Sequence, residues 1–303
     1  MISNSNMLLS ILEQMRSKLL ERTSLNELPE SVWKRTSALN TWGTNAIEGS
    51  TIGWKDAEKV LLQGITPSGK PIDDVRVTIQ HEEAFSSLKD PIEITLELVL
   101  KLHEQVFFGV LKDAGRWRRI NVKITGAKIS PPRMEKVRDE MIRWEEEYDR
   151  RDMIGEDTFT LGAWMHHEFE RIHPFSHGNG RIGRLLLNLH FLNRNWPPVH
   201  ILPKQRDGYI RSLNEYARGD TTSLEEFLKV CMGASLLDLL DQLGTSSDEL
   251  LSLKEGSLVS PYDEKYLAQR CKEGEIPALK DGREWRTSSR ALDLYVEMLG
   301  RKG

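Results

Sequence analysis

The sequence has 303 residues, of which 39% are hydrophobic and 29% are charged, and its 42 basic and 46 acidic residues give a formal net charge of −4. This near balance excludes a global attraction to nucleic acid or anionic membranes, so any such binding must be local. The two cysteines are too few for a disulfide framework or a thiolate metal site. Residues 7–15 lack the apolar core of a signal peptide, and no apolar run has membrane-spanning length. We therefore expect a cytoplasmic protein without a membrane partner.

Helical periodicity dominates the chain from its start. Apolar residues recur at intervals of three and four in residues 7–25, 56–64, 92–111 and 135–150. This spacing predicts amphipathic helices and a mostly α-helical protein.

Two segments depart from this pattern. In residues 116–132, Val122 and Ile124 alternate with polar neighbours ahead of Gly126, which predicts a short β-hairpin. Residues 244–257 are rich in serine and acidic residues and are predicted to form a linker.

The stretch HPFSHGNGRIGR, residues 173–184, has the composition of an anion-binding loop. Proline disfavours helix at the residue before it, so the helix predicted for residues 158–172 should end at His173. The glycines allow backbone N–H groups to approach an anion, while the asparagine, the arginines and the next helix N-terminus add donors and positive charge. A plain turn would not require all these groups, so the pattern favours a polyphosphate ligand. The residues that carry this prediction are Gly178, Asn179, Gly180, Arg181 and Arg184.

This stretch resembles the signature of the Fic family, H-x-F-x-[D/E]-G-N-G-R-x-x-R, at every fixed position except His177. The resemblance implies a nucleotide-binding transferase, a protein adenylyltransferase that moves AMP from ATP to a Ser, Thr or Tyr hydroxyl of a target protein. His173 would be the general base, a role that suits imidazole because its ordinary pKa lies near neutrality. Asn179 and Arg181 would stabilise the phosphates during AMPylation, and Arg184 would hold the γ-phosphate.

The segment TNAIEGST fits the family's inhibitory motif [S/T]-x-x-x-E-[G/N] through Thr44, Glu48 and Gly49. On its own, Glu48 would be interpreted as an acid on a helix surface. In the family this glutamate reaches the second signature arginine, here Arg184, and occupies the place of the γ-phosphate, because a carboxylate competes with phosphate for one guanidinium. The resemblance therefore implies autoinhibition.

Two further segments resemble the family. The predicted hairpin, through Val122, Ile124 and Gly126, is similar to a flap that aligns the target by strand addition. Tyr209 matches a family tyrosine near the nucleotide base.

The resemblance covers roughly residues 35–240 and implies the all-α Fic fold. We expect an N-terminal helical region with the inhibitory helix in residues 1–94, a Fic domain in residues 95–243 and a separate module in residues 258–303.

His177 stands where the family has an acid that binds Mg²⁺. Because Mg²⁺ prefers oxygen ligands and imidazole suits softer metals such as Mn²⁺, the cofactors implied are ATP with Mg²⁺ or Mn²⁺. Three outcomes stay open: weaker transfer with Mg²⁺, use of a softer metal, or direct contact of His177 with phosphate. It is also open whether Glu48 positions water for AMP removal.

A metal hydrolase is a further interpretation, because His166, Glu170 and His173 fall on one helical face. The zincin pattern H-E-x-x-H is absent, since Arg171 stands where the second histidine is required. The sequence does not favour this alternative.

Residues 258–303 resemble a compact winged helix-turn-helix module, with Lys280, Arg283 and Arg286 on the wing. The segment holds nine basic and eight acidic residues, so DNA binding and a docking or homodimer role are equally open. A second functional hypothesis follows: a catalytically weak, Fic-derived ATP sensor or transcriptional regulator that binds DNA through this module.

Overall fold

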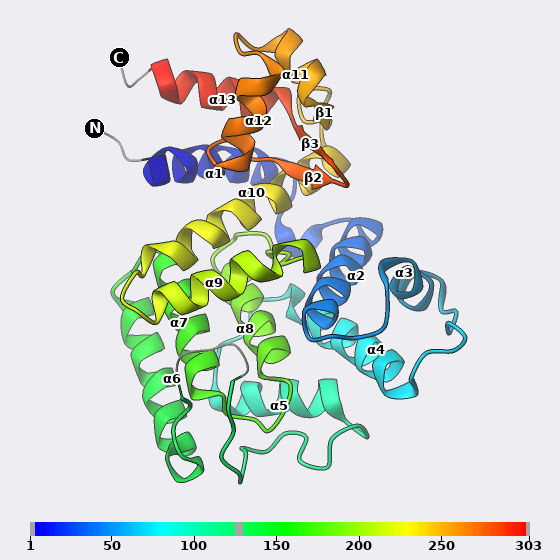
Figure 1. Cartoon of the computed structure of the whole chain (residues 1–303), viewed down its shortest axis with the longest axis vertical. Helices are drawn as coiled ribbons and strands as arrows, with labels where there is room; N and C mark the ends of the chain where they lie inside the picture. Colours follow the sequence, from blue (N-terminus) through cyan, green and yellow to red (C-terminus); the bar gives the residue numbers. More distant parts are fainter. Residues whose placement is uncertain (1–3, 125–129, 301–303) are drawn as a thin grey trace. The chain divides into compact units, whose positions relative to one another are not determined.

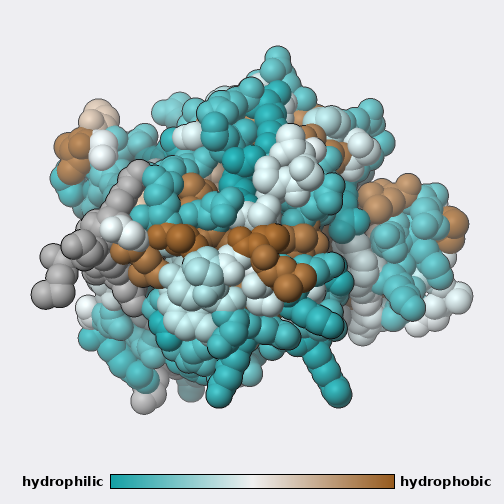
Figure 2. Space-filling model, turned by 90° about the horizontal axis from the view of Figure 1, so that it is seen from above, coloured by the Kyte–Doolittle hydropathy of each residue, from teal (hydrophilic) through white to brown (hydrophobic). Residues whose placement is uncertain are grey.

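The computed structural model describes residues 4–124 and 130–300. The chain forms two compact units, a large unit, Pro29–Phe227, and a terminal unit that combines Met1–Leu28 with Leu228–Gly303. Within the described residues, none of the helices combines the length and the hydropathy that a membrane span requires. The face drawn in Figure 2 is mostly hydrophilic, with hydrophobic residues in a narrow band and small patches.

The large unit is built of helices, as Figure 1 shows. Helix α7 packs between α6 and α8, while α2 packs against α3, α4 and α8, and α4 against α5. These helices are α2 (Glu30–Ile47), α3 (Trp54–Gln63), α4 (Ile72–Ser86), α5 (Leu96–Phe107), α6 (Val137–Met153), α7 (Thr158–Ile172), α8 (Asn179–Asn193) and α9 (Arg206–Tyr216).

Helix α8 lies at the centre of the large unit. Nearly every residue from Asn179 to Leu192 is buried, including Arg184 and Asn188. A helix that is buried on all sides has no solvent face along which it can shift. Its first turn is therefore held firmly in place, which matters because the predicted anion loop leads directly into it.

Helix α7 begins and ends at the residues that the sequence indicates. The side chain of Asp157 accepts hydrogen bonds from the backbone N–H groups of Phe159 and Thr160, which caps the first turn. The helix ends at Ile172, and His173 follows with φ 51°, in the left-handed region that non-glycine residues rarely adopt. The helix end predicted at His173 is confirmed.

The predicted β-hairpin is not formed by the residues that can be assessed. Residues 116–124 and 130–132 contain no β-strand, and Val122 and Ile124 lie in irregular backbone. The prediction of strands is wrong for these residues, whereas Gly126 lies outside the described residues. The carbonyl groups of Ile120 and Pro132 are bound by the buried guanidinium of Arg118 and not by a neighbouring strand.

The terminal unit combines helices with a small antiparallel sheet of order β1-β3-β2. In the sheet Leu251 pairs with Thr287 and Leu279 with Arg286. Gly282, with φ 57°, makes the turn between β2 and β3. The elements are α1 (Asn4–Leu20), β1 (Leu251–Ser252), α11 (Leu253–Val259), α12 (Glu264–Lys272), β2 (Leu279–Asp281), β3 (Glu284–Thr287) and α13 (Ser289–Gly300), together with most of α10 (Thr222–Leu243).

The terminal unit has the order of a strand, two helices, a hairpin and a final helix, and its assignment as a winged module stays a prediction. The predicted linker is wrong in its second half, because residues 251–257 form β1 and most of α11. Ser252 caps α11 by accepting a hydrogen bond from Glu255 N, and the Glu255 carboxylate accepts one from Ser252 N. The module thus begins earlier than residue 258.

The two compact units do not coincide with the three ranges that the sequence predicts. Helix α1 packs against α13 in the terminal unit, whereas α2 to α4 belong to the large unit. The division into residues 1–94, 95–243 and 258–303 stays a prediction about roles along the chain.

Asp248 joins distant parts of the terminal unit. Its side chain is fully buried and accepts hydrogen bonds from Arg22, near the end of α1, and from Arg290 on α13. Burial alone would raise the pKa of Asp248, but these two guanidinium groups outweigh it and lower the pKa. The carboxylate is therefore ionised and ties the N-terminal helix to the C-terminal one.

We expect Asp248→Asn to destabilise the terminal unit by about 3 kcal/mol, because two arginines lose the buried charge that compensates them. Thermal and urea unfolding followed by circular dichroism would measure the loss. The exposed Asp293 on α13 provides the control Asp293→Asn. Equal stability of the two variants would contradict the structural role of Asp248.

Candidate active site

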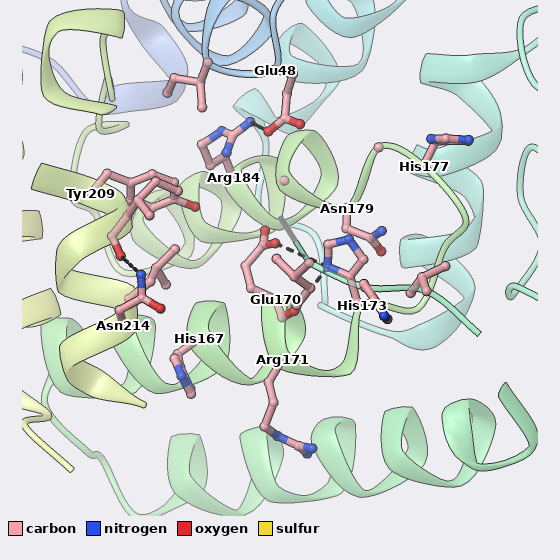
Figure 3. Close-up of a pocket in the computed structure, with 18 of the residues that line it drawn as sticks. Glu48, His167, Glu170, Arg171, His173, His177, Asn179, Arg184, Tyr209 and Asn214 are labelled. Carbon is pink, nitrogen blue, oxygen red and sulfur yellow. Dashed lines mark hydrogen bonds and ion pairs between the residues drawn. The ribbon is translucent and has the colours of Figure 1, made fainter. Parts of the chain in front are cut away.

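A cavity of about 600 Å³ opens in the large unit. Figure 3 shows that its labelled side chains come from the end of α2, from α7 and the loop after it, and from α8 and α9. A cavity of this volume accommodates a ligand of nucleotide size. The residues of interest that line it are Glu48, Val122, Ile124, Glu170, His173, His177, Gly178, Asn179, Gly180, Arg184 and Tyr209.

The loop before α8 is closed by its own atoms. Gly178 has φ 83°, and a Cβ there would lie 2.3 Å from the Phe107 ring, so only glycine fits. The Asn179 side chain accepts a hydrogen bond from Phe175 N (2.8 Å) and donates one to Phe175 O (2.9 Å). Asn179 therefore holds the loop in shape, a use that the sequence pattern did not predict.

His103 supports the same loop from α5. Its Nδ1 accepts a hydrogen bond from Gly115 N (2.9 Å), so its Nε2 carries the proton and donates to the carbonyl of His177 (3.1 Å). The ring stacks on Phe175, with centroids 3.7 Å apart. His103 was missed at the sequence level because nothing in its local pattern separates it from a histidine of an amphipathic helix.

The carboxylate of Glu48 lies at the N-terminus of α8. Its Oε1 accepts a hydrogen bond from Arg184 Nη2 (2.7 Å), and Arg184 Nε donates to Thr44 Oγ1 (2.6 Å). A Cβ at Gly180 would lie 2.3 Å from this Oε1, so the glycine makes the space that the carboxylate fills. Burial would raise the pKa of Glu48, but the Arg184 guanidinium outweighs it and lowers the pKa. An anion thus occupies the predicted anion site.

Arg181 lies near this ion pair, and its positive charge acts on Glu48. Its guanidinium sits over the Phe107 ring, 4.6 Å from the centroid. Its Nε is buried and finds no hydrogen-bond partner among the residues that the structure describes. Arg181 is not among the residues that line the cavity, so its contact with a ligand stays a prediction.

His173 presents one nitrogen to the cavity. Its Nδ1 lies 3.2 Å from the carbonyl of Glu170, which can only accept, so Nδ1 carries the proton and Nε2 is left as the basic nitrogen. Burial lowers the pKa of His173, although the hydrogen bond that its Nδ1 donates to the Glu170 carbonyl opposes this shift. The ring is therefore neutral at neutral pH and can accept a proton.

Tyr209 supports Arg184 from α9. The Nδ1 of His166 donates to the carbonyl of Gly183 (3.1 Å), so its Nε2 accepts from the Tyr209 hydroxyl at 2.7 Å. The Arg184 guanidinium lies 5.8 Å from the Tyr209 ring centroid. Tyr209 lines the cavity, but its hydroxyl is directed at His166, and its role near a nucleotide base stays a prediction.

His177 differs from the other signature residues. It is exposed, and Figure 3 shows its ring pointing away from His173 and Arg184. Among residues 4–124 and 130–300, no group of three or more His, Cys, Asp or Glu side chains is arranged to hold a metal ion. The alternative of a metal hydrolase based on His166 and Glu170 finds no support, because His166 is engaged by Tyr209 and Gly183.

Residues 93–191 match the model of the Fic/DOC family. These residues form a Fic domain. Its Fic signature is the loop that closes on Asn179 and leads into α8, and the Glu48 that reaches this loop precedes the matched range.

Relatives with assigned names are similar to this Fic protein over part of their length. Protein adenylyltransferase fic-1 of Caenorhabditis elegans is 28% identical over 270 residues, covering 84% of this chain and 52% of that protein. Protein adenylyltransferase Fic of Drosophila grimshawi is 30% identical over 195 residues, covering 63% of this chain and 40% of that protein. The chain thus spans about half the length of the curated relatives or less.

Solved structures share the fold. A fragment of Fic-1 from C. elegans superposes with a TM-score of 0.66 at 25% identity, covering 79% of this chain and 72% of that one. A Fic-domain signaling protein from Bacteroides thetaiotaomicron gives a TM-score of 0.67 at 20% identity, covering 78% of this chain and 97% of that chain. The helical Fic fold predicted from the sequence is confirmed.

Glu170 is a second buried acid of the site. Its Oε2 lies 3.9 Å from His173 Nδ1, and its Oε1 is buried without a hydrogen-bond partner among the described residues. Burial raises the pKa of Glu170 to about 8, although Arg184 opposes the shift. The folded protein therefore keeps this carboxyl protonated at pH values where the unfolded chain has lost the proton.

This difference sets the sign of a pH effect. Between the ordinary pKa of 4.5 and about 8 the folded state binds more protons at Glu170 than the unfolded state, so stability falls as pH rises through this window. Glu170→Gln cannot ionise, and we expect its melting temperature to exceed that of the wild type by about 2 °C or more at pH 8.5. At pH 5 the two should agree. The exposed Glu146 provides the control Glu146→Gln, and a gain that is the same at both pH values would contradict the assignment.

Proposed function

We propose that this Fic protein is an adenylyltransferase that transfers AMP from ATP to a Ser, Thr or Tyr hydroxyl of a target protein, and that Glu48 inhibits it. One observation carries the proposal: the Glu48 carboxylate lies on Arg184 at the N-terminus of α8, where glycines and a second arginine also converge. Helix N-termini with such surroundings bind phosphate. The names of the relatives point to the same activity.

The chemistry follows from the arrangement around His173. Its Nε2 accepts the proton of the target hydroxyl, whose oxygen then attacks the α-phosphorus of ATP. A new O–P bond forms while the bond from the α-phosphorus to the bridging β-phosphate oxygen breaks, and pyrophosphate leaves. Arg181 and Arg184 offset the negative charge of the leaving group. The lowered pKa of His173 keeps the base unprotonated near neutral pH.

Inhibition follows from competition for one guanidinium. The γ-phosphate requires Arg184, and the Glu48 carboxylate holds it at 2.7 Å. Thr44 fixes the same arginine through its hydroxyl and its carbonyl. Helix α2 therefore has to release Arg184 before ATP binds in the productive position.

The donor set does not fit the Mg²⁺ that the family signature implies. The position of the expected acid holds His177, an exposed imidazole turned away from the ion pair. Mg²⁺ requires oxygen ligands, and imidazole suits softer ions such as Mn²⁺. We assign no step to a metal ion, and ATP is the cofactor proposed.

The target is proposed to lie along residues 120–124. Val122 and Ile124 line the same cavity as His173, and their apolar side chains suit an extended peptide. Tyr209 is proposed to lie near the base of ATP, as the resemblance implies.

Glu48→Gly should increase transfer of label from radioactive ATP to protein by about tenfold or more, because a charged hydrogen bond worth roughly 1.5–3 kcal/mol no longer competes for Arg184. His173→Ala in the same background should abolish the label. Glu30→Gly, which changes an exposed acid of the same helix, is the control. No gain in rate or ATP affinity in a folded Glu48→Gly protein would refute inhibition by Glu48.

A second candidate is an ATP-binding sensor that reads DNA through residues 258–303. The winged order of the terminal unit favours it. Against it, two wing cations have contacts within the module: Lys280 lies over Trp285, and Arg286 lies 3.9 Å from Asp281. ATP binding without labelling of protein in the Glu48→Gly variant would support the sensor.

AMP removal is a separate activity. Loss of label from labelled protein during a chase without ATP would reveal it.

The replacement His177→Asp tests whether the missing oxygen ligand limits the use of Mg²⁺. If only the oxygen ligand is missing, Mg²⁺-dependent transfer in the Glu48→Gly background should rise by on the order of a hundredfold. Calorimetry of ATP binding, in Mg²⁺ and in chelator, complements the rate. Weaker binding in chelator with no gain in Mg²⁺ would overturn the missing-ligand account and assign phosphate contact to His177.

A further inference from the structure

Arg118 is a buried cation directly behind the proposed catalytic base. Only 2% of its surface is exposed. Its Nε donates to the carbonyl of His173 (2.8 Å), its Nη1 to that of Ile120 (2.8 Å), and its Nη2 to those of Pro132 (2.5 Å) and Ile172 (3.5 Å). One guanidinium thus binds four carbonyl groups from three stretches of the chain.

Within the described residues, none of these hydrogen bonds goes to a carboxylate, although buried arginines ordinarily pair with one. The compensation comes from the C-terminal end of α7. The carbonyls of Ile172 and His173 belong to the last turn, where they lack partners within the helix and carry the negative end of its dipole. The backbone N–H of Arg118 also donates to Pro174 O (2.9 Å). Arg118 therefore completes the helix end from which His173 projects.

The contact with His173 fixes an uncommon backbone conformation. His173 has φ 51°, which a side chain with a Cβ adopts only when its surroundings impose it. The hydrogen bond from Arg118 Nε holds the carbonyl of this residue while the Glu170 carbonyl holds its Nδ1. Together they determine where Nε2 lies in the cavity.

The other donors of Arg118 bind the carbonyl groups of Ile120 and Pro132. Ile120 opens the proposed target-facing segment, residues 120–124, whose Val122 and Ile124 line the cavity. One rigid, planar group therefore binds both this segment and His173.

We propose that Arg118 is a positioning residue that fixes the target-facing segment and His173 in one frame, so that the target hydroxyl meets Nε2. This inference rests on the proposed transferase function. Lysine cannot replace arginine here, because a single ammonium lacks the planar fork that reaches carbonyls in three directions. Among the contacts described above, Arg118 binds His173 and Pro174 at the start of the loop but neither the Glu48 ion pair nor residues 175–184, so ATP binding should depend on it little.

The test compares Arg118→Lys and Arg118→Met with Arg119→Lys and Arg119→Met, all in the Glu48→Gly background. Arg119 is the exposed neighbour in sequence and serves as the matched control. Three quantities are measured: the hydrogen exchange of the amides of residues 119–124, the calorimetric ATP affinity, and kcat and KM for ATP in protein labelling.

For Arg118→Met we expect faster exchange in residues 119–124 and a kcat lower by on the order of a hundredfold, since a misplacement of about 1 Å has an effect of this size. KM and affinity for ATP should change by less than about threefold, because a positioning role leaves the phosphate site intact. Arg118→Lys should fall between the wild type and the methionine variant. The Arg119 variants should match the parent.

Unchanged exchange and kcat in both Arg118 variants would overturn the proposal, and so would a parallel loss of ATP affinity, which indicates a general structural role. If Arg118→Met fails to fold, the lysine variant decides by the same criteria. If the Glu48→Gly parent itself transfers no AMP, the transferase function fails, and the exchange data alone decide whether Arg118 holds the segment.

Discussion

The Arg184 guanidinium lies inside α8 with only 4% of its surface exposed, and a charge at such a depth needs compensation from its surroundings. Helix α2 supplies it through Thr44 and Glu48, while α9 places the Tyr209 ring beside it. His166 on α7 in turn holds the Tyr209 hydroxyl. Helices α2, α7 and α9 are thus oriented around the Arg184 guanidinium. Removal of one of these side chains would leave the buried charge less well compensated.

The same requirement links the two parts of the proposed function, inhibition by the Glu48 carboxylate and binding of a phosphate at one place. When Glu48 leaves, a buried guanidinium is exposed to an open cavity, and an anion with several oxygens satisfies it better than water does. The positive charge of Arg181 nearby also favours an anion at this place. Under this proposal, the affinity for a polyphosphate and the affinity for the helix that carries Glu48 both arise from the charge of Arg184.

Sequence reasoning reached the parts of the site that are local in the chain. Residues 173–184 carry the loop, the helix end and both arginines within twelve positions, and the spacing of these residue types is informative by itself. The contribution of Glu48 came from resemblance to a family motif, because no pattern links two residues 136 positions apart. The contacts of His103 and Arg118 and the raised pKa of Glu170 were not predicted, since they depend on burial and on distant carbonyl groups.

The two errors in secondary structure have a similar cause. The two-residue strand β1 exists only through pairing with β3, which lies about 35 residues later, so its own sequence reads as part of a linker. In the segment before Pro132 the alternation of apolar residues is genuine, but the carbonyls at its ends are bound by Arg118 instead of a partner strand. Alternation reports which side chains face an apolar region, and it does not report what the backbone binds.

Asn179 closes the loop on the backbone of Phe175 with two hydrogen bonds that involve no ligand. The conformational entropy of this loop is therefore lost when the chain folds, and little remains to be lost when a nucleotide arrives. Under the proposed function, a site preorganised in this way binds its nucleotide without a change in the loop, and only the helix that carries Glu48 has to move. Occupancy of the site is then controlled by the blocking carboxylate and not by the loop.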